Sequence, residues 1–408
     1  MSEKKNVPKI RFPGFTDDWE QRKLSELFEE RHVFTKITEK YPRLSFTIEE
    51  GVISPEDRKT NKRDFLMKDE ANKKFLITEV GDIIYNPANV VFGAIHRNSL
   101  QNGCLSPIYR IFVTQQDSRF MECVVRSPLF ISKLAQRTEG SVVKLKTLKP
   151  EAFLDMDVNI APTTEEQAKI ADFIYSIDNL ITLHQRKSEA LSDYKKGMLQ
   201  KMFPREGEKV PEIRFPGFTG AWEQRKLGEC LLDITYGFTN PMSDTENGPW
   251  KITAKDIVDG KIDYSSARHT SQREYESLTD KSKPLIGDLL LTKDGTLGRT
   301  AIVNAENICI NQSVALLRFN EKCSAQYVKT LLDTPMYQKQ MLDDAGGGTI
   351  KHIYITKVDK MFILIPSKME QVQLVGFFAN LDNLITLHQR KCDELKEYKK
   401  GLLQQMFV

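Results

Sequence analysis

Residues 177–203 read IDNLITLHQRKSEALSDYKKGMLQKMF, and residues 381–407 read LDNLITLHQRKCDELKEYKKGLLQQMF, identical at 19 of 27 positions. An opening block repeats in the same way, as VPKIRFPGFTDDWEQRKLSEL at residues 7–27 and VPEIRFPGFTGAWEQRKLGEC at residues 210–230, identical at 16 of 21. The offsets are 203 and 204 residues, so one sequence unit is used twice. Near-identical ends indicate that each unit binds the same kind of partner, and different middles indicate that the two units bind different ligands. The alternative is a duplication whose middles have simply drifted apart.

Each unit is expected to close with a long helix. Residues 165–203 contain no proline and one glycine, and threonines followed by acidic residues precede them, which is typical of a helix start. Such a helix would be roughly 58 Å long at about 1.5 Å per residue. Apolar residues at heptad spacing predict a coiled-coil seam. In the first copy the seam comprises Ile170, Ile177, Leu191 and Met198, with Phe173, Leu180 and Tyr194 three residues after the first three; in the second copy it comprises Leu374, Leu381, Leu395 and Leu402.

The short connection between the two units sets the direction of these helices. An apolar stripe of this length needs a partner, and its own duplicate is the obvious one. Residues 204–209 are too few to run back along the first helix, so the second middle must begin where that helix ends. The two helices are therefore predicted to pack antiparallel about a pseudo-twofold axis. The same symmetry predicts that Val408 lies relative to Val7 as Phe203 lies relative to Val210.

The middles read as short strands mixed with short helices. In the first middle the β-rich runs are residues 75–80, 82–85 and 107–113, and in the second they are residues 251–257, 285–292, 300–303 and 314–319. Helices are expected at residues 120–138 and 325–345. The predicted fold class is α+β, with two pseudo-symmetric α/β domains separated by two long antiparallel coiled-coil helices. The predicted boundaries are 1–161 for the first domain, 162–209 for the central scaffold helix and linker, 210–365 for the second domain and 366–408 for the C-terminal scaffold helix.

Bulk composition narrows the class of protein. The 408 residues carry a net charge of +3, so any nucleic-acid contact must use local positive charge. The first ten residues have no apolar core of a signal peptide, and the apolar run at residues 361–365 is too short to span a bilayer. The six cysteines show neither CxxC pairs nor an even-spaced framework. These features predict a cytoplasmic protein with reduced thiols.

Several repeated segments resemble a known family, the specificity (S) subunits of type I restriction–modification enzymes. They are the opening block, the helix openings at residues 162–167 and 366–371, and the LITLHQRK helices. GDLLLTKDGTLGR at residues 287–299 resembles the central part of that family's target recognition domains. The resemblance implies two target recognition domains, each reading one half of a bipartite double-stranded DNA site, and helices that hold two methyltransferase (M) subunits. It also implies that restriction–translocase (R) subunits join the complex.

Candidates for DNA contact were sought on the loops of the two middles. Phosphate binding uses Lys, Arg and small hydroxyls, whereas base reading uses Arg, Lys, Asn and Gln, although each such residue taken singly is more often simply a solvated surface residue. Where the second copy has KDGT at residues 293–296, the first has NPAN at 86–89, so the family pattern does not carry over to the first domain. The candidates in the first domain are Arg58, Lys59, Asn61, Lys62, Arg63, Asn86, Asn89 and Arg97. The candidates in the second are Tyr236, Lys293, Thr296, Arg299 and Lys351.

The chain is expected to have no catalytic residues, no cofactor and no metal. NPAN at residues 86–89 lacks the aromatic residue that stacks a flipped base in adenine methyltransferases, and a structural turn explains it. AGGGT at residues 345–349 lacks the Lys-Ser/Thr of a P-loop, and fits a phosphate contact or a flexible loop equally well. The six histidines have no metal-ligand spacing. Two alternatives stay open here: a coiled-coil scaffold that binds protein partners, and an enzyme whose motif is not recognised.

Overall fold

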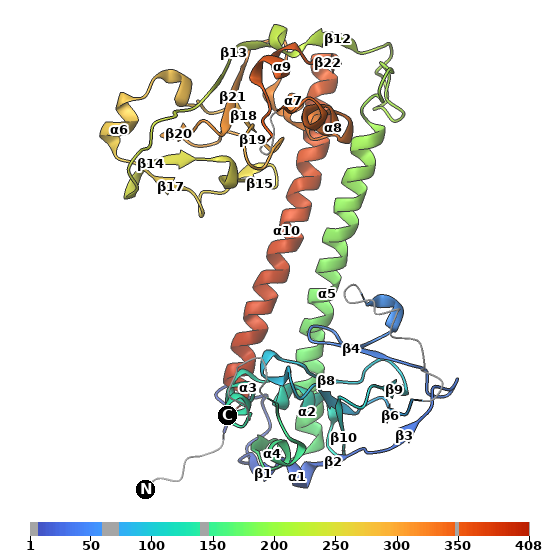
Figure 1. Cartoon of the computed structure of the whole chain (residues 1–408). Helices are drawn as coiled ribbons and strands as arrows, with labels where there is room; N and C mark the ends of the chain where they lie inside the picture. Colours follow the sequence, from blue (N-terminus) through green and yellow to red (C-terminus); the bar gives the residue numbers. More distant parts are fainter. Residues whose placement is uncertain (1–6, 59–72, 139–146, 347–350, 408) are drawn as a thin grey trace. The chain divides into compact units, whose positions relative to one another are not determined.

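The computed structural model describes residues 7–58, 73–138, 147–346 and 351–407 (Figure 1). The chain forms two compact units, one of residues 1–185 with 389–408 and the other of residues 186–388. Each unit therefore contains one opening block, one middle and a part of both long helices. Within the described residues, no helix is long and apolar enough to cross a membrane.

The first unit is built on a four-stranded antiparallel sheet. Its strand order is β2 (Phe28–Glu30), β10 (Arg110–Thr114), β7 (Ile83–Tyr85) and β8 (Ile95–Arg97). A second sheet has the order β3 (Phe34–Thr35), β6 (Phe75–Thr78) and β9 (Gly103–Leu105), and a hairpin pairs β4 (Ser45–Thr47) with β5 (Gly51–Ile53). The opening strand β1 (Glu20–Lys23) pairs with β11 (Asp157–Ile160), the strand just before the long helix.

Short helices pack on the first sheet. They are α1 (Leu24–Leu27), α2 (Ser118–Val125), α3 (Pro128–Gln136) and α4 (Pro150–Leu154). The single helix expected at residues 120–138 is two helices, because the Ser127 hydroxyl accepts from the backbone N–H of Phe130 (3.2 Å) and starts a new helix with Pro128 at its first turn. Tyr85, Phe112 and Phe153 form the centre of the core, with ring centroids 5.0 to 5.8 Å apart.

The second unit repeats this plan with different additions. Its main sheet has the order β13 (Leu231–Tyr236), β21 (Val314–Phe319), β18 (Leu289–Thr292) and β19 (Thr300–Ile302). A second sheet has the order β17 (Arg268–His269), β14 (Thr245–Ile252) and β20 (Ile308–Ile310); β15 (Ile257–Val258) pairs with β16 (Lys261–Ile262), and β12 (Glu223–Lys226) with β22 (Phe362–Ile365). The helices are α6 (Gln272–Ser277), α7 (Ala325–Leu332), α8 (Pro335–Asp343) and α9 (Ile355–Lys360). The helix expected at residues 325–345 is divided by Pro335, which opens α8.

The two main sheets are equivalent strand by strand. β2 corresponds to β13, β10 to β21, β7 to β18 and β8 to β19, and all neighbours are antiparallel. The repeated Gly-Asp motif makes the same turn before β7 and β18. Gly81 and Gly287 have φ angles of 104° and 95°, which favour glycine. The carboxylates of Asp82 and Asp288 each accept a hydrogen bond from the backbone N–H three residues earlier, at 2.8 and 2.7 Å.

Two long helices, α5 (Thr164–Lys201) and α10 (Lys368–Met406), carry the LITLHQRK repeats (Figure 1). In the first unit, Lys399 donates to both carboxylate oxygens of Asp178 at 2.6 and 2.7 Å. Three residues further along α5, the Ile181 carbonyl accepts from the thiol of Cys392 (3.5 Å), seven residues earlier on α10.

The second unit contains the repeat-equivalent ion pair, between Lys195 and Asp382 at 2.6 Å. Just after the end of α5, Phe203 contacts Phe378, which lies earlier on α10, with ring centroids 5.8 Å apart. The two helices therefore run antiparallel in each unit, which confirms the direction predicted from the short linker. The mixed helix-and-sheet plan of both units likewise confirms the α+β class.

The buried seam of α5 differs from the predicted heptad pattern. Ile170 and Ile177 are buried as predicted, but Leu180 and Tyr194 are 45% and 49% exposed, so their assignment to the seam was wrong. On a helix, the residues three and four positions after a given residue lie on either side of it. The partner helix covers the residues at the four-residue spacing. The side chains that are buried at this spacing are Ile174, Ile181, Ser188 and Met202. In α10, Leu374, Leu381 and Leu402 are buried as predicted.

The opening block of each unit packs onto the long helices. The guanidinium of Arg11 donates to both carboxylate oxygens of the buried Glu166, and Arg214 does the same to the buried Glu370. Trp19 is buried, and its indole N–H donates to the Glu166 carboxylate at 3.3 Å. Two distant segments of the chain are thus held together by the same ion pair in both units.

The last turn of α10 lies beside the first opening block, as the predicted symmetry requires. In the first unit the backbone N–H of Ile10 donates to the carbonyl of Gln405 at 3.3 Å. In the second unit the equivalent Ile213 donates to the equivalent carbonyl, that of Lys201, at 2.9 Å. Val408 itself lies outside the described residues, but its neighbour Gln405 has the predicted relation to the opening block.

Candidate nucleic-acid interface

One predicted contact residue of each unit lies directly after an internal strand of the main sheet. Asn86 comes directly after β7, and Lys293 directly after β18. Both strands are buried along their whole length, so the following residues are the first that reach the surface. The fold therefore places the two most different parts of the repeated middles at equivalent sites.

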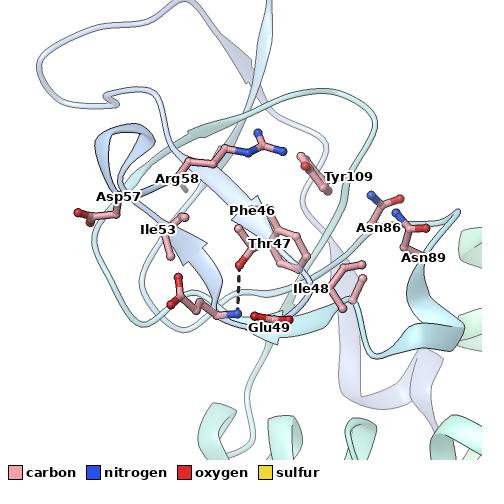
Figure 2. A pocket seen from close by; sticks show the side chains of 12 residues that line it. Phe46, Thr47, Ile48, Glu49, Ile53, Asp57, Arg58, Asn86, Asn89 and Tyr109 are labelled. Atoms are coloured by element: carbon pink, nitrogen blue, oxygen red, sulfur yellow. Dashed lines mark hydrogen bonds between the residues drawn. The ribbon is translucent and has the colours of Figure 1, made fainter. Parts of the chain in front are cut away.

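In the first unit, three predicted residues line one cavity of about 500 Å³. Figure 2 shows Asn86 and Asn89 side by side at one edge, with Arg58 coming from a different segment. The remaining wall is the β4–β5 hairpin with Tyr109. The sequence offered no signal for the hairpin or for Tyr109, because only the fold brings them beside β7.

The NPAN segment forms a turn, as the sequence predicted. The Asn86 side-chain oxygen accepts from the backbone N–H of Ala88 (3.1 Å), and the Asn86 carbonyl accepts from Asn89 (3.1 Å). The carbonyl of Pro87 accepts from Leu148 at 3.1 Å, which ties the turn to the segment before α4. This turn holds both asparagine side chains at the cavity edge.

Electrostatics at this cavity are mixed. Glu49, Glu50 and Asp57 contribute carboxylates, whereas Arg58 contributes the positive charge. Burial raises the pKa of the Tyr109 phenol, and the nearby Arg58 guanidinium lowers it in part. The site is therefore not a phosphate cradle of clustered positive charge, but a cavity with both donors and acceptors.

The other predicted residues of the first unit are not part of this cluster. Lys59, Asn61, Lys62 and Arg63 lie outside the described residues. Arg97 lies on β8, where its side chain donates to the Ser118 hydroxyl of α2 (2.8 Å) and its backbone N–H to Glu122 (3.1 Å). The structure thus assigns Arg97 contacts with α2.

In the second unit, Tyr236 and Lys293 come together at the end of β18. The Lys293 ammonium lies 5.3 Å from the centroid of the Tyr236 ring and donates to Asp294 at 2.6 Å. The Asp294 carboxylate also contacts a ring nitrogen of His352 at 2.6 Å. Burial raises the pKa of Asp294, but the hydrogen bonds and charges of Lys293 and His352 outweigh it, so the pKa lies below its usual range.

The remaining predicted residues of the second unit surround this cluster. Lys351 is exposed and precedes His352, and the backbone N–H of Ile353 donates to the Lys293 carbonyl at 2.9 Å. Thr296 is exposed on the loop between β18 and β19. Arg299 directly precedes β19, and its guanidinium donates to the carbonyl of Ile257 at 3.0 Å. Sequence reasoning did not identify His352, which is 58 residues from its partner Asp294.

Two further observations concern ligands. Within the part of the chain that the structure describes, no group of three or more His, Cys, Asp or Glu residues is placed to hold a metal ion. The six cysteines are buried and unpaired with one another in disulfides.

Comparisons with known proteins show what the chain is similar to. Residues 238–397 match the type I restriction modification DNA specificity domain. The specificity subunit of the type I restriction enzyme MjaVIII of Methanocaldococcus jannaschii is 22% identical over 378 residues, which cover 89% of this chain and 84% of that protein. A putative type I specificity subunit of Haemophilus influenzae, S.HindORF215P, is 32% identical over a shorter stretch, 26% of this chain and 27% of that protein.

Solved structures show the same fold along nearly the whole chain. The S subunit of the type I restriction–modification system from M. genitalium has a TM-score of 0.59 at 12% identity, covering 98% of this chain and 99% of that one. A chain from a type I restriction–modification system whose complex assembly has been studied has a TM-score of 0.55 at 17% identity, covering 97% and 98%. The chain thus carries a match to this DNA specificity domain over residues 238–397, and along most of its length it is similar in sequence and in fold to type I specificity subunits.

Proposed function

We propose that this chain gives a type I restriction–modification complex its DNA sequence specificity, with each middle reading one half of a bipartite site. The observation that carries the proposal is the pair of equivalent sheets whose internal strands, β7 and β18, end in different polar side chains. Two domains that recognise different half-sites need the same supporting sheet with different side chains at its surface. We place the recognition domains at residues 1–161 and 210–365, and the scaffold helices at 162–209 and 366–408.

We further propose that the chain has no catalytic activity of its own and works in the cytoplasm. Methyl transfer and cleavage would then belong to M and R subunits that join it. The similarity to type I specificity subunits supports this division of labour, and it does not favour a scaffold that binds only protein partners. Incubation of the purified chain with S-adenosylmethionine and its DNA site should give no methylated product. Methyl transfer by the chain alone would show that the chain is itself an enzyme.

Apolar side chains on the long helices support the docking of two M subunits. In the first unit Leu180 and Leu183 of α5 are each 45% exposed, and in the second Leu384 and Leu387 of α10 are 43% and 40% exposed. The two pairs are repeat equivalents in the identical LITLHQRK segments. Exposed apolar pairs kept identical on two charged helices are typical of a protein interface.

Each long helix also carries an exposed tyrosine. Tyr194 and Tyr398 are repeat equivalents, 49% and 55% exposed. In the second unit Tyr194 of α5 contacts Phe377 of α10, with ring centroids 6.4 Å apart, so that its side chain leans across to the helix that carries Leu384. Tyrosine is enriched in interfaces because it combines a large apolar ring with a hydroxyl.

Sequence-specific retention on DNA tests the main proposal. The chain is assembled with its M subunits and allowed to select from a pool of duplexes with randomised sequence. We expect recovery of one bipartite sequence that survives competitor DNA and weakens as salt is raised. Methylome sequencing of cells with and without the chain should identify the same site. Retention of all duplexes alike would contradict the proposal.

Paired leucine variants test the docking surfaces. Leu180→Asp with Leu183→Asp should reduce the stoichiometry from two M subunits per chain to one, measured by native mass spectrometry, and Leu384→Asp with Leu387→Asp should do the same. Thr182→Asp with Gln185→Asp is the matched control, because these exposed residues point to other sides of a helix that turns about 100° per residue. Two M subunits bound to both leucine variants would exclude these surfaces.

A further inference from the structure

The cavity at the end of β7 has the properties of a site for a single unstacked base. We propose that it receives one extruded, amino-bearing nucleobase, adenine or cytosine, from the half-site read by the first domain. This inference rests on the proposed DNA-reading function and adds a ligand class for this cavity. A volume of about 500 Å³ is enough for a base with part of its sugar, and proteins that extrude a base from the duplex hold it in such a pocket.

Unsatisfied polar groups converge on the cavity. The Asn86 side-chain oxygen is used by the turn, which leaves its amide nitrogen as a donor. Among the described residues, neither that nitrogen nor the side-chain amide of Asn89 has a hydrogen-bond partner. The Nε atom of Arg58 is buried and also has no partner within the described residues. Buried polar groups are normally paired, so an orphaned guanidinium nitrogen beside two open amides indicates a missing ligand.

The opposite wall is rigid. The tip of the β4–β5 hairpin is held by a ring nitrogen of His96 that contacts the Ile48 carbonyl at 2.7 Å, and by the backbone N–H of Glu50 that donates to the Thr47 hydroxyl at 3.0 Å. Gly51 closes the hairpin with φ of 70°, and a Cβ there would lie 2.6 Å from the Cβ of His96. A wall fixed in this way needs little ordering when a ligand enters.

The distribution of donors and acceptors selects the chemistry of the base. Glu49 and Glu50 supply acceptors for an exocyclic amino group, and Asn86 and Arg58 supply donors for a ring nitrogen. On their Watson–Crick edges adenine and cytosine offer an amino group beside a ring-nitrogen acceptor. Guanine has an N–H donor beside its amino group there, and thymine has no amino group. The buried ring of Phe46 gives the base an apolar surface, and the carboxylates keep the phosphate backbone at the rim.

The equivalent position of the second unit differs. There the end of β18 is occupied by the ion pair of Lys293 with Asp294 and by the contact of Asp294 with His352. The inference therefore applies to one half-site only, and the other half-site serves as an internal control.

Fluorescent base analogues in the selected site test the inference. Adenines are replaced one at a time by 2-aminopurine and cytosines by pyrrolocytosine, and emission is measured in the complex with M subunits. We expect emission to rise at one position of the first half-site. No position of the second half-site should show a rise that depends on the cavity. Asn89→Leu should abolish that rise and weaken retention about tenfold, because it removes one of the two amides that line the cavity.

Asn89→Leu should leave the fold intact, because the Asn89 side chain makes no hydrogen bond among the described residues. Glu56→Gln, an exposed residue next to the cavity wall, is the matched control and should leave the emission unchanged. Specific retention without any rise, or a rise that persists in Asn89→Leu, overturns the inference and leaves the DNA-reading function standing. Loss of specific retention in the wild-type complex overturns both.

Discussion

The guanidinium of Arg11 forms a bidentate ion pair with the carboxylate of Glu166, with N–O distances of 2.6 and 2.8 Å. The two residues are 155 positions apart and join the opening block to the first turn of α5. The Glu166 side chain is 0% exposed. The pair is repeated by Arg214 and Glu370, with both distances 2.7 Å. This ion pair is a fixed element of the scaffold rather than of the DNA-reading surface.

Arg11→Ala should strongly destabilise the first unit. Removal of the guanidinium leaves a buried carboxylate without its counter-ion, which costs about 3 kcal/mol. Urea unfolding of the wild-type and variant chains measures the difference. Arg22→Ala is the matched control, because Arg22 pairs with Glu26 at the surface, where solvent screens the pair and it contributes little to stability. Equal effects of the two substitutions would contradict the assignment.

Glu122 should make the stability of the first unit depend on pH. Burial by itself raises its pKa, but His96, Arg126, the Tyr175 hydroxyl and the Arg97 N–H favour the carboxylate, so its pKa falls to about 2. Since the folded pKa lies below the ordinary value of 4.5, the stabilisation is present above pH 4.5 and is lost as the pH falls towards 2.

The measurement compares Glu122→Gln with the wild type by urea unfolding at several pH values. The wild type should be more stable by about 3 kcal/mol near pH 6, and the gap should narrow as the pH is lowered from 5 towards 3. Glu56→Gln removes an exposed carboxylate and should show no such gap. A gap independent of pH would mean that the carboxylate charge is not what stabilises this site.

Exchange of residues 30–154 for the corresponding segment of a relative should change one half of the methylated site. The exchanged segment contains the internal strand β7 and the cavity, but leaves β1, β11 and the long helices intact. The second half of the site should stay the same because β18 and its loops are untouched. Methylome sequencing gives both halves at once. A change in both halves would show that the two middles do not read independently.

A circular permutant that joins Val408 to Met1 and opens within residues 204–209 should fold and keep its DNA specificity. The backbone hydrogen bond from Ile10 to Gln405 places the last turn of α10 beside the opening block, as the bond from Ile213 to Lys201 does across the existing linker. Exposed connections tolerate such cuts. Thermal unfolding and retention on the selected site are the measurements, and a permutant opened inside α5, after Ser188, should fail both.

The sequence by itself determined the duplication, the two long helices and their antiparallel direction. These features depend on local pattern and on chain length: a repeat is visible at fixed offset, a helix follows from its periodicity and its N-terminal residues, and a six-residue linker excludes a long return. It also placed Asn86 and Lys293 among the candidate contacts, because loops with amide and cationic side chains are recognisable without knowing their neighbours.

Tertiary structure alone decided which residues meet. The seam on α5 includes Ile174 and Ile181 rather than Leu180, because only the position of the partner helix selects between the two sides of a heptad. The cavity arises where the β4–β5 hairpin closes over the end of β7, some forty residues away along the chain, and Asp294 meets His352 across 58 residues. Which distant side chains meet depends on how the segments pack against each other, and this packing cannot be predicted from the local sequence of each segment.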